Sequence, residues 1–347
     1  MKPFLYTPLP TRVVFGRGKI SEAPNELRKL GISKPIIVTT PQQRDAGETL
    51  AHSTNGVAYP HAEMHTPVRV TSAAIDFVSK NGIDGIVALG GGSSTGLGKA
   101  IAFRTDLPQL VIPTSYAGSE MTNILGETED DEKKTKRDAR IQPEAVIYDP
   151  DLLATLPSGF AATSGLNAMA HAVEALYASD GNPVVWLMAE EGIRAMAEAL
   201  PKRNGGHDEA LYGAWLCGTV LGSCSMGFHH KLCHVLGGSF NLPHAETHAI
   251  ILPHAAAYNA PATRAAMTRI AVALGASDAP RGLFELSNSL GVATALKDIG
   301  MAESDLAKAA DIAAATPYPN PRPLERGAIV SLLQDAFFGR PPPQTSH

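Results

Sequence analysis

Roughly the first 150 residues alternate short apolar runs with longer segments in which apolar residues recur at helical spacing. The short runs are rich in Val, Ile and Leu and predict buried strands at 35–40, 83–89, 110–113 and 145–148. Residues 66–80 are typical of an amphipathic helix that a glycine ends. Strands and helices in this alternation predict an α/β domain with a parallel, doubly wound (Rossmann-like) sheet.

The pattern changes after Leu156 and Pro157, where strand-like runs give way to long segments rich in Ala, Leu and Met. Pro, Gly or Asn separates most of these segments, as is usual between helices. The segments lie at 159–179, 183–200, 208–226, 262–274, 281–291 and 303–314. We therefore predict two domains, an α/β domain at 1–157 and an all-α domain at 158–347.

Composition excludes several classes of function. The 347 residues are 44% hydrophobic and 18% charged, which is typical of a folded globular protein. A net charge of −5 with scattered Lys and Arg gives no nucleic-acid-binding surface. We expect no membrane span and no signal peptide, because no apolar run is long enough. Three cysteines without metal-type spacing favour free thiols and a cytoplasmic location.

A run of charged residues at 127–140 changes from acidic to basic along its length. It lies between two of the predicted strands. Such runs usually face water. We therefore expect a solvated hairpin or loop there.

A glycine-rich turn, Gly90-Gly91-Gly92-Ser93, joins a predicted strand to a predicted helix. Glycine lets the backbone approach a pyrophosphate, and the first turn of a helix offers it free N–H groups. A tight turn without a ligand is the alternative, because the pattern is not GxGxxG. The strand–turn–helix context favours a dinucleotide site. The predicted cofactor-binding residues are Thr39, Gly91, Gly92, Ser93, Thr114, Ser115, Tyr116 and Ser119.

Histidines gather in the stretch from Gly227 to His244. His230 and His234 are four residues apart, so on a helix they share one face. Asn167 and His171 form a second pair at the same spacing on an earlier helix. Separate histidines, each satisfied in the core or at a helix end, are the alternative. So many titratable groups in one helical domain favour a site for metal binding or acid–base chemistry.

Motifs along nearly the whole chain are similar to those of the iron-containing alcohol dehydrogenase-like superfamily. They are FGRG at 15–18, GGGS at 90–93, PTSYAGSE at 113–120, HAVEA at 171–175 and HHKLCHVLGGSFNLPHAETHAIILPH at 229–254. The resemblance implies a metal site of one aspartate and three histidines. By motif these ligand positions fall on Asn167, His171, His230 and His244, and His234 matches a further active-site histidine.

Two departures from that superfamily are informative. The aspartate position holds Asn167, and Gly96 stands where many members have an aspartate three residues after the serine of GGGS. Both departures, with segments 116–122, 126–149 and 316–324, resemble the maleylacetate reductase branch. That resemblance implies reduction of maleylacetate to 3-oxoadipate with NADH or NADPH in bacterial degradation of aromatic compounds.

The departure at Asn167 changes the expected chemistry. With asparagine in place of the family's aspartate, the site loses its one anionic ligand, the type that a hard cation prefers. Three histidines can nevertheless hold zinc. Hydride addition to the carbon–carbon double bond of an enone leaves a delocalised enolate, which hydrogen-bond donors can stabilise without a Lewis acid. We therefore expect no metal, and regard Asn167, His171, His230 and His244 as vestigial ligand positions.

Histidines suit both tasks of this reaction, since their pKa lies near neutrality. We assign proton donation and enolate stabilisation to His234 and His244, without dividing the roles between them. The substrate is a dicarboxylate, so cationic groups are expected near it. The full set of predicted catalytic residues is His234, His244, His171, His230, Arg322 and Lys231. The alternative for Arg322 is an ordinary surface arginine, and packing or capping is favoured for His248 and His254.

Two other functions remain open at this point. The first is a metal-dependent alcohol or aldehyde dehydrogenase of the same superfamily, with the Asn167 amide as a weak ligand. The second is a protein that binds a nucleotide without catalysis. Activity after metal chelation distinguishes the first from a metal-free reductase, and lack of any carbonyl or enone turnover would indicate the second.

The sequence predicts that NADPH is used as well as NADH. Carboxylates that select NAD bind the ribose 2′-hydroxyl and repel a 2′-phosphate. After the strand at 35–40 there is no carboxylate before Asp45. Steady-state kinetics with both cofactors test this prediction, and a preference for NADH above about a thousandfold (roughly 4 kcal/mol) would contradict it.

The resemblance implies a homodimer, and we expect no nucleic-acid or membrane partner. The early strand candidate at 12–15 would pair with its copy by adding to the edge of the sheet. Light scattering of the purified protein should give twice the chain mass, and a monomer would exclude this arrangement.

Overall fold

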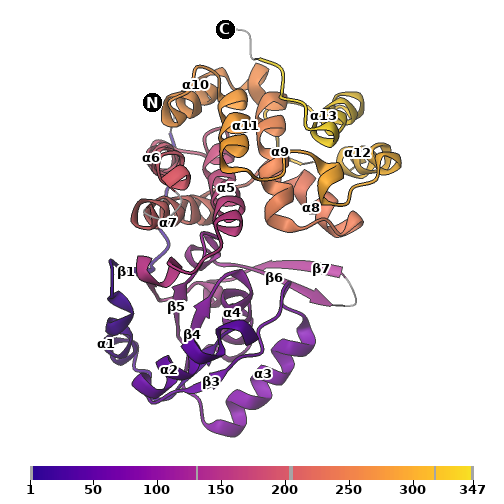
Figure 1. Ribbon diagram of the computed structural model, residues 1–347. Helices are drawn as coiled ribbons and strands as arrows, with labels where there is room; N and C mark the ends of the chain where they lie inside the picture. The colour runs from indigo at the N-terminus through magenta and orange to yellow at the C-terminus, as the bar shows by residue number, and fades with distance from the viewer. Residues whose placement is uncertain (1–2, 130–131, 203–205, 316–317, 345–347) are drawn as a thin grey trace. The chain divides into compact units, whose positions relative to one another are not determined.

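The computed structural model describes residues 3–129, 132–202, 206–315 and 318–344 (Figure 1). It divides into two compact units. One contains residues 8–156, and the other contains residues 3–7 and the described residues from Pro157 onward. The division predicted from the sequence differs from this one, because it places residues 3–7 and Pro157 in the α/β domain.

The unit of residues 8–156 is built on a six-stranded, wholly parallel sheet (Figure 1). Its order is β1 (Arg12–Phe15), β8 (Ala145–Tyr148), β5 (Gln109–Pro113), β4 (Gly85–Gly90), β2 (Pro35–Val38) and β3 (Val57–Tyr59). The predicted doubly wound sheet is confirmed. The strand boundaries lie within two residues of the predicted ones, and those at 12–15 and 145–148 are identical. The three-residue β3 was missed.

Helices pack on both faces of this sheet, which explains why its central strands are apolar throughout. On one face, α1 (Ala23–Lys29) and α2 (Arg44–Thr54) contribute to a cluster that includes Ile37. On the other, α3 (Val68–Asn81) and α4 (Gly92–Thr105) contribute to a cluster that includes Ile36. Neighbouring residues of β2 therefore face opposite cores, as the two-residue period of a strand requires.

The chain reverses direction across the sheet between β2 and β4. From β2 it continues outward to the edge strand β3, then returns to the other side of β2 as β4. In parallel sheets a ligand crevice forms at the carboxyl ends of strands at such a switch point. Gly90 occupies this position with φ of 144°, a conformation that favours glycine.

The charge run forms an antiparallel hairpin of β6 (Ile124–Glu129) and β7 (Glu132–Arg137). The expected hairpin is confirmed for the described residues, while 130–131 lie outside them. Full solvation was wrong, because the side chain of Glu127 is 2% exposed. Its carboxylate pairs with Arg104 of α4 at 2.8 Å and with Lys136 of β7 at 3.3 Å, which compensates the buried charge.

The second unit is helical in its described residues, which confirms the all-α prediction (Figure 1). Its α-helices are α5 (Ser158–Ala175), α6 (Pro183–Ala199), α7 (His207–Ser223), α8 (Phe228–Phe240), α9 (His244–Asn259), α10 (Arg264–Leu274), α11 (Ala279–Leu290), α12 (Leu306–Ala315) and α13 (Arg326–Phe338). Pro253 lies inside α9, an interruption that hides this helix in the sequence pattern. The helix α13 was not predicted either.

A tight connection joins α8 to α9. Helix α8 ends at Phe240 and is capped by Asn241, whose φ of 55° and ψ of 33° place it in the left-handed region. Pro243 then precedes His244, the first residue of α9. Apolar side chains of both helices pack with α12 and α13 in one buried cluster that includes Leu232 and Ile251. This packing fixes the helices that carry most of the histidines.

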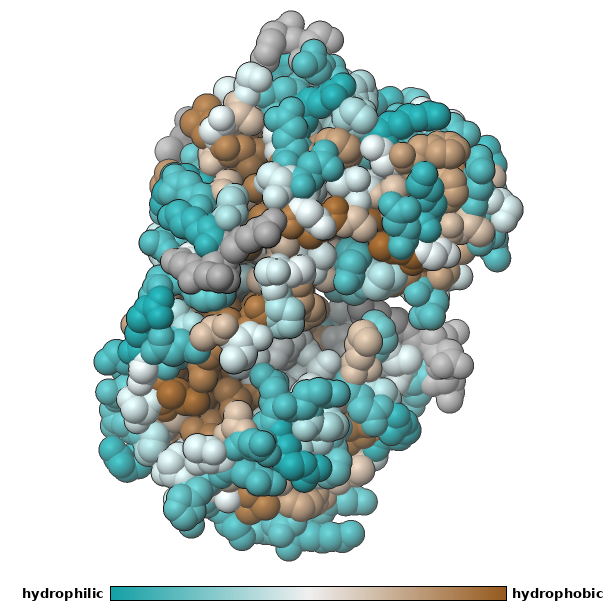
Figure 2. Space-filling view, in the orientation of Figure 1, coloured by the Kyte–Doolittle hydropathy of each residue, from teal (hydrophilic) through white to brown (hydrophobic). Residues whose placement is uncertain are grey.

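Hydrophilic side chains cover most of the visible face of each unit in Figure 2. The large apolar side chains that remain exposed are few among the described residues and include Leu5, Met64, Leu187 and Val272. None of the described helices combines the length and hydropathy that crossing a bilayer demands.

Candidate active site

Helix α5 presents a buried row of polar residues. Asn167, His171 and Glu174 follow one another at four and three residues, so they share one face. Their side chains are 7%, 4% and 0% exposed. The first two are the pair that the sequence singled out, whereas Glu174, within the HAVEA motif, was not recognised as part of the site.

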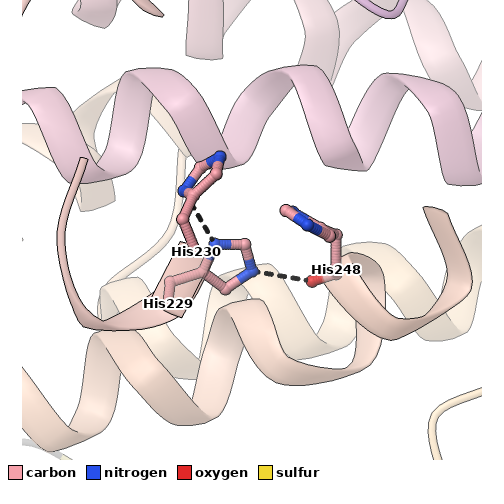
Figure 3. Close-up of side chains that lie close together, drawn as sticks. All are labelled: His229, His230 and His248. Atoms are coloured by element: carbon pink, nitrogen blue, oxygen red, sulfur yellow. Dashed lines mark hydrogen bonds between the residues drawn. The ribbon is translucent and has the colours of Figure 1, made fainter. Parts of the chain in front are cut away.

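The imidazoles of α8 and α9 pack against that face. His171 stacks on His230 with ring centroids 5.0 Å apart, and His230 is also 5.0 Å from His248. The ring centroids of His244 and His248 are 4.2 Å apart. The structure thus brings together the predicted residues His171, His230 and His244. It adds His229 and His248, which Figure 3 shows beside His230. Packing or capping was expected of His248, and no signal in the sequence distinguishes it from a core histidine.

Burial keeps the inner imidazoles neutral. It lowers the pKa of His171, His230 and His248 well below the usual value, and repulsion from neighbouring histidines acts in the same direction. The pKa of His229 is lowered to about 4 for the same reasons. These four residues therefore provide lone pairs and single N–H groups rather than positive charge near neutral pH.

His234 and His244 differ from that group because both side chains are exposed within this unit. His234 lies one turn after His230, with ring centroids 6.4 Å apart. His244 begins α9, beside the buried His248. These are the two residues predicted to donate a proton and to stabilise the enolate, and they are placed where solvent protons can reach them.

Glu174 connects α5 to the first turn of α8. Its Oε2 accepts a hydrogen bond from the Gly227 N–H at 2.8 Å, and Oε1 accepts one from the His229 N–H at 2.7 Å. Oε2 is also 2.7 Å from Nδ1 of His230. Burial raises the pKa of the Glu174 carboxyl, while these contacts oppose that rise. The carboxylate thus occupies the positive end of α8.

Several buried polar atoms of the cluster have no hydrogen-bond partner in the described part of the chain. They are Oδ1 of Asn167, Nδ1 of His171, Nε2 of His230 and both ring nitrogens of His248. Nitrogen atoms of His229, His230 and His248 lie within 4.8 Å of one another. This donor set is neutral, because both oxygens of Glu174 are engaged elsewhere. It does not fit the ligand set of one aspartate and three histidines that iron would take.

The predicted cofactor residues gather at the carboxyl edge of the sheet. Thr39 follows β2, while Gly91, Gly92 and Ser93 connect β4 to α4, whose first turn has no side-chain cap. A β-carbon at Gly91 would lie 3.0 Å from Oγ of Ser115, so the two strand ends approach closely. Thr114 accepts a hydrogen bond from Gln43 at 2.8 Å. Free N–H groups, glycines and hydroxyls at one edge fit a dinucleotide phosphate.

A buried lysine supports this edge and was missed in the sequence. Lys99 of α4 is fully buried and donates to the carbonyl of Ser119, to Oγ1 of Thr122 at 2.9 Å and to the carbonyl of Ile124 at 3.1 Å. Burial lowers its pKa to about 7, partly opposed by the carboxylate of Glu120. Lys99 therefore holds the segment after β5, which contains the predicted residues Tyr116 and Ser119.

Of the two predicted cations, Lys231 belongs to α8 and Arg322 contacts α9. Nζ of Lys231 is 5.9 Å from the ring centroid of Tyr318. The guanidinium of Arg322 lies 4.3 Å from the ring centroid of Tyr258 and donates to the carbonyl of the same residue at 3.0 Å. Arg322 is thus held in a defined orientation rather than free on the surface. The preceding residues 316–317 of this motif lie outside the described part of the chain.

Comparison with known proteins agrees with this arrangement. Residues 10–150 match the iron-containing alcohol dehydrogenase model, and residues 161–337 match the C-terminal model of the Fe-containing alcohol dehydrogenase family. The maleylacetate reductase of Burkholderia cepacia is 52% identical over 98% of this chain and 99% of its own length. The crystal structure of maleylacetate reductase from Agrobacterium tumefaciens has 50% identity and a TM-score of 0.96, with 99% and 100% coverage.

The chain belongs to the iron-containing alcohol dehydrogenase family. Within that family it is similar to the maleylacetate reductases at about half identity over nearly the full length; the reductase of Rhizobium sp. (strain MTP-10005) is 50% identical over 99% of this chain. The expected resemblance is confirmed, and the chain is an oxidoreductase. Asn167 and the histidines of α5, α8 and α9 are the residues by which it must be compared with other members of the family.

One buried histidine outside the cluster gives a testable pH effect. His254 of α9 is 3% exposed and packs against Phe284, and burial lowers its pKa to about 4. A depressed pKa in the folded state means that unfolding takes up a proton below about pH 6.5. The stability contributed by neutral His254 is therefore present above pH 6.5 and is lost as pH falls towards 4.

We expect the His254→Leu variant to lose less stability than the wild type between pH 6.5 and pH 4. Urea unfolding at a series of pH values measures this difference. Parallel pH dependences of the two proteins would show that His254 does not titrate as described.

Proposed function

We propose that this enzyme reduces the carbon–carbon double bond of maleylacetate to give 3-oxoadipate, using NADH or NADPH and no metal. Maleylacetate is an enone flanked by two carboxylates. The reduced nicotinamide supplies the hydride, which adds to the carbon β to the ketone. The resulting enolate takes a proton at the neighbouring carbon to complete the reaction.

The observation that carries the metal-free proposal is Asn167 at the ligand position of the family's aspartate. Its amide oxygen is buried and neutral, and Glu174 does not substitute for the missing anion, since its carboxylate binds the first turn of α8. An enolate spreads its charge and is far less basic than an alkoxide, so hydrogen bonds can stabilise it adequately. The reaction thus agrees with a site of neutral donors.

Within this proposal the exposed and buried histidines have different tasks. His234 and His244 reach solvent protons, so one donates to the substrate carbon and the other stabilises the enolate oxygen. The neutral rings of His171 and His230 bound the pocket. Lys231 and the oriented guanidinium of Arg322 provide positive charge for the substrate carboxylates.

The nicotinamide cofactor is supported by the carboxyl edge of the sheet. The uncapped start of α4 offers N–H groups to the pyrophosphate, and Gly91 allows close approach. Thr39, Ser93, Thr114, Ser115, Tyr116 and Ser119 complete the predicted set. We propose that both NADH and NADPH bind there.

A cytoplasmic homodimer that serves bacterial degradation of aromatic compounds completes the proposal. β1 lies at one edge of the sheet, where it can add to a second copy. The cysteines Cys217, Cys224 and Cys233 are all buried and unpaired, as is common in a reducing compartment. Cell fractionation would contradict this location if it found the enzyme outside the cytoplasm.

A metal-dependent alcohol or aldehyde dehydrogenase is the second candidate. It is favoured by the ring nitrogens that lack partners at His171, His230 and His248. Three imidazoles are a known ligand set for zinc. Under this alternative, chelation would abolish activity and Zn²⁺ or Fe²⁺ would restore it.

The deciding experiment measures maleylacetate turnover after chelation, with metal content determined on the same sample. We expect kcat to change by less than about twofold, a barrier change of under roughly 0.5 kcal/mol. Loss of turnover that only metal restores would contradict the metal-free proposal. A protein that binds NADH but turns over no enone or carbonyl would contradict both enzymatic proposals.

The variant Asn167→Asp provides the matched control for that experiment. It restores the carboxylate at the family's ligand position, so we expect it to bind Zn²⁺ more tightly than the wild type by titration calorimetry. Unchanged affinity would mean that position 167 does not face the three histidines as the family motif implies.

A further inference from the structure

The contacts of His230 determine which of its ring nitrogens carries the proton. A neutral imidazole has one N–H donor and one acceptor, and the partner of one nitrogen sets the state of the other. Nδ1 of His230 has two neighbours, Oε2 of Glu174 at 2.7 Å and Nδ1 of His229 at 3.4 Å. Nε2 is buried and has no partner in the described residues.

The tautomer of His229 excludes this residue as a hydrogen-bond donor to Nδ1 of His230. Its Nε2 is 3.1 Å from the backbone carbonyl of His248, which can only accept (Figure 3). Sγ of Cys233 lies 3.5 Å from the same nitrogen but is only a weak donor. The carbonyl contact therefore places a proton on Nε2 of His229. The ring is fully buried and neutral, so its Nδ1 has a lone pair and cannot donate to His230.

The hydrogen bonds of Glu174 show which atom donates in its contact with Nδ1 of His230. Its carboxylate accepts hydrogen bonds from the peptide N–H groups of Gly227 and His229 at the start of α8. Burial raises the pKa of this carboxyl, but these N–H donors and the helix dipole oppose the rise and favour the ionised form. An ionised carboxylate only accepts, so the hydrogen of the 2.7 Å contact belongs to Nδ1 of His230.

We propose that Glu174 is a positioning residue that holds His230 with its proton on Nδ1 and its Nε2 lone pair directed into the histidine cluster. His230 then acts as a hydrogen-bond acceptor in the site and does not donate a proton. In many metal sites a carboxylate accepts a hydrogen bond from one ring nitrogen of a histidine. This contact fixes the tautomer and raises the basicity of the other ring nitrogen. The tautomer is independent of the proposed substrate.

The consequence for the reaction rests on the proposed function. If maleylacetate is reduced here, the proton for the substrate carbon comes from a group other than His230. The exposed residues His234 and His244 remain as its source. Nε2 of His230 instead accepts a hydrogen bond from the donor and orients it.

The tautomer can be measured directly on the resting enzyme. Long-range ¹H–¹⁵N NMR correlation of protein labelled with ¹⁵N-histidine distinguishes a protonated from an unprotonated ring nitrogen. The His230→Gln variant identifies the signal of His230 by its disappearance. We expect Nε2 to be unprotonated at pH 7.5. A protonated Nε2 would overturn the proposal, whatever the enzyme's substrate.

Two variants separate positioning from simple structural support. Glu174→Gln removes the charge and allows the amide to present either its oxygen or its NH₂ group to Nδ1, so the tautomer is no longer fixed. The matched control is Asp180→Asn. Asp180 accepts hydrogen bonds from the backbone N–H of Ser225 at 3.0 Å and from its hydroxyl at 2.7 Å, just before α8. It forms no hydrogen bond or ion pair with a histidine of the described chain.

We expect Glu174→Gln to show both tautomers of His230 and to reduce kcat by about 10- to 100-fold, with helical content retained by circular dichroism. Asp180→Asn should preserve the tautomer and should change kcat by less than about twofold. An unchanged tautomer in Glu174→Gln, or the same loss in both variants, would overturn the positioning role. If Glu174→Gln does not fold, the wild-type NMR measurement alone decides. Failure of the wild type to reduce maleylacetate would reject the proposed function and leave the tautomer assignment intact.

Discussion

The histidine cluster depends on one buried interaction, the carboxylate of Glu174 in the first turn of α8. A charge without solvent is costly unless hydrogen bonds satisfy it. Here α5 carries the carboxylate, and the start of α8 compensates its charge with peptide N–H groups and an imidazole N–H. Charge-assisted hydrogen bonds contribute roughly 1.5–3 kcal/mol each. The same contacts that join the helices therefore also orient the ring of His230.

This arrangement explains how the substitution at position 167 affects the charge balance of the site. With Asn167, the buried face of α5 carries one carboxylate, whose charge the start of α8 compensates. With an aspartate there, the same face would carry two carboxylates separated by two helical turns. Neutral imidazoles could not compensate the second one, so a bound cation would be needed. Asparagine removes that requirement and keeps a side chain of nearly the same shape.

Much of the fold could be predicted from the sequence because its signals are local. Apolar runs and helical periodicity identify the central strands and most helices, and the glycine turn identifies the start of α4. Boundaries and interruptions were harder, since β3 has three residues and Pro253 lies within α9. The motifs also pointed to His171, His230, His234 and His244, which the structure places on α5, α8 and α9 with their rings close together.

What the sequence could not reveal depends on contacts between distant segments. Glu174 and Lys99 read as ordinary helix residues until the structure shows which backbone groups they bind. His248 is indistinguishable from a core histidine without the ring of His230 beside it. Glu127 belongs to a charge run that normally faces water, and only its contact with Arg104 explains its burial.

The pairing of the sheet also constrains the order in which the α/β unit can form. β1 is made first on the ribosome, yet its strand partner is β8, about 130 residues later in the chain. Closing so long a loop is entropically costly and slow compared with forming local helices. β1 (Arg12–Phe15) therefore has no strand partner until β8 (Ala145–Tyr148) has been synthesised. Chaperone binding or premature association during synthesis should concentrate on this first strand.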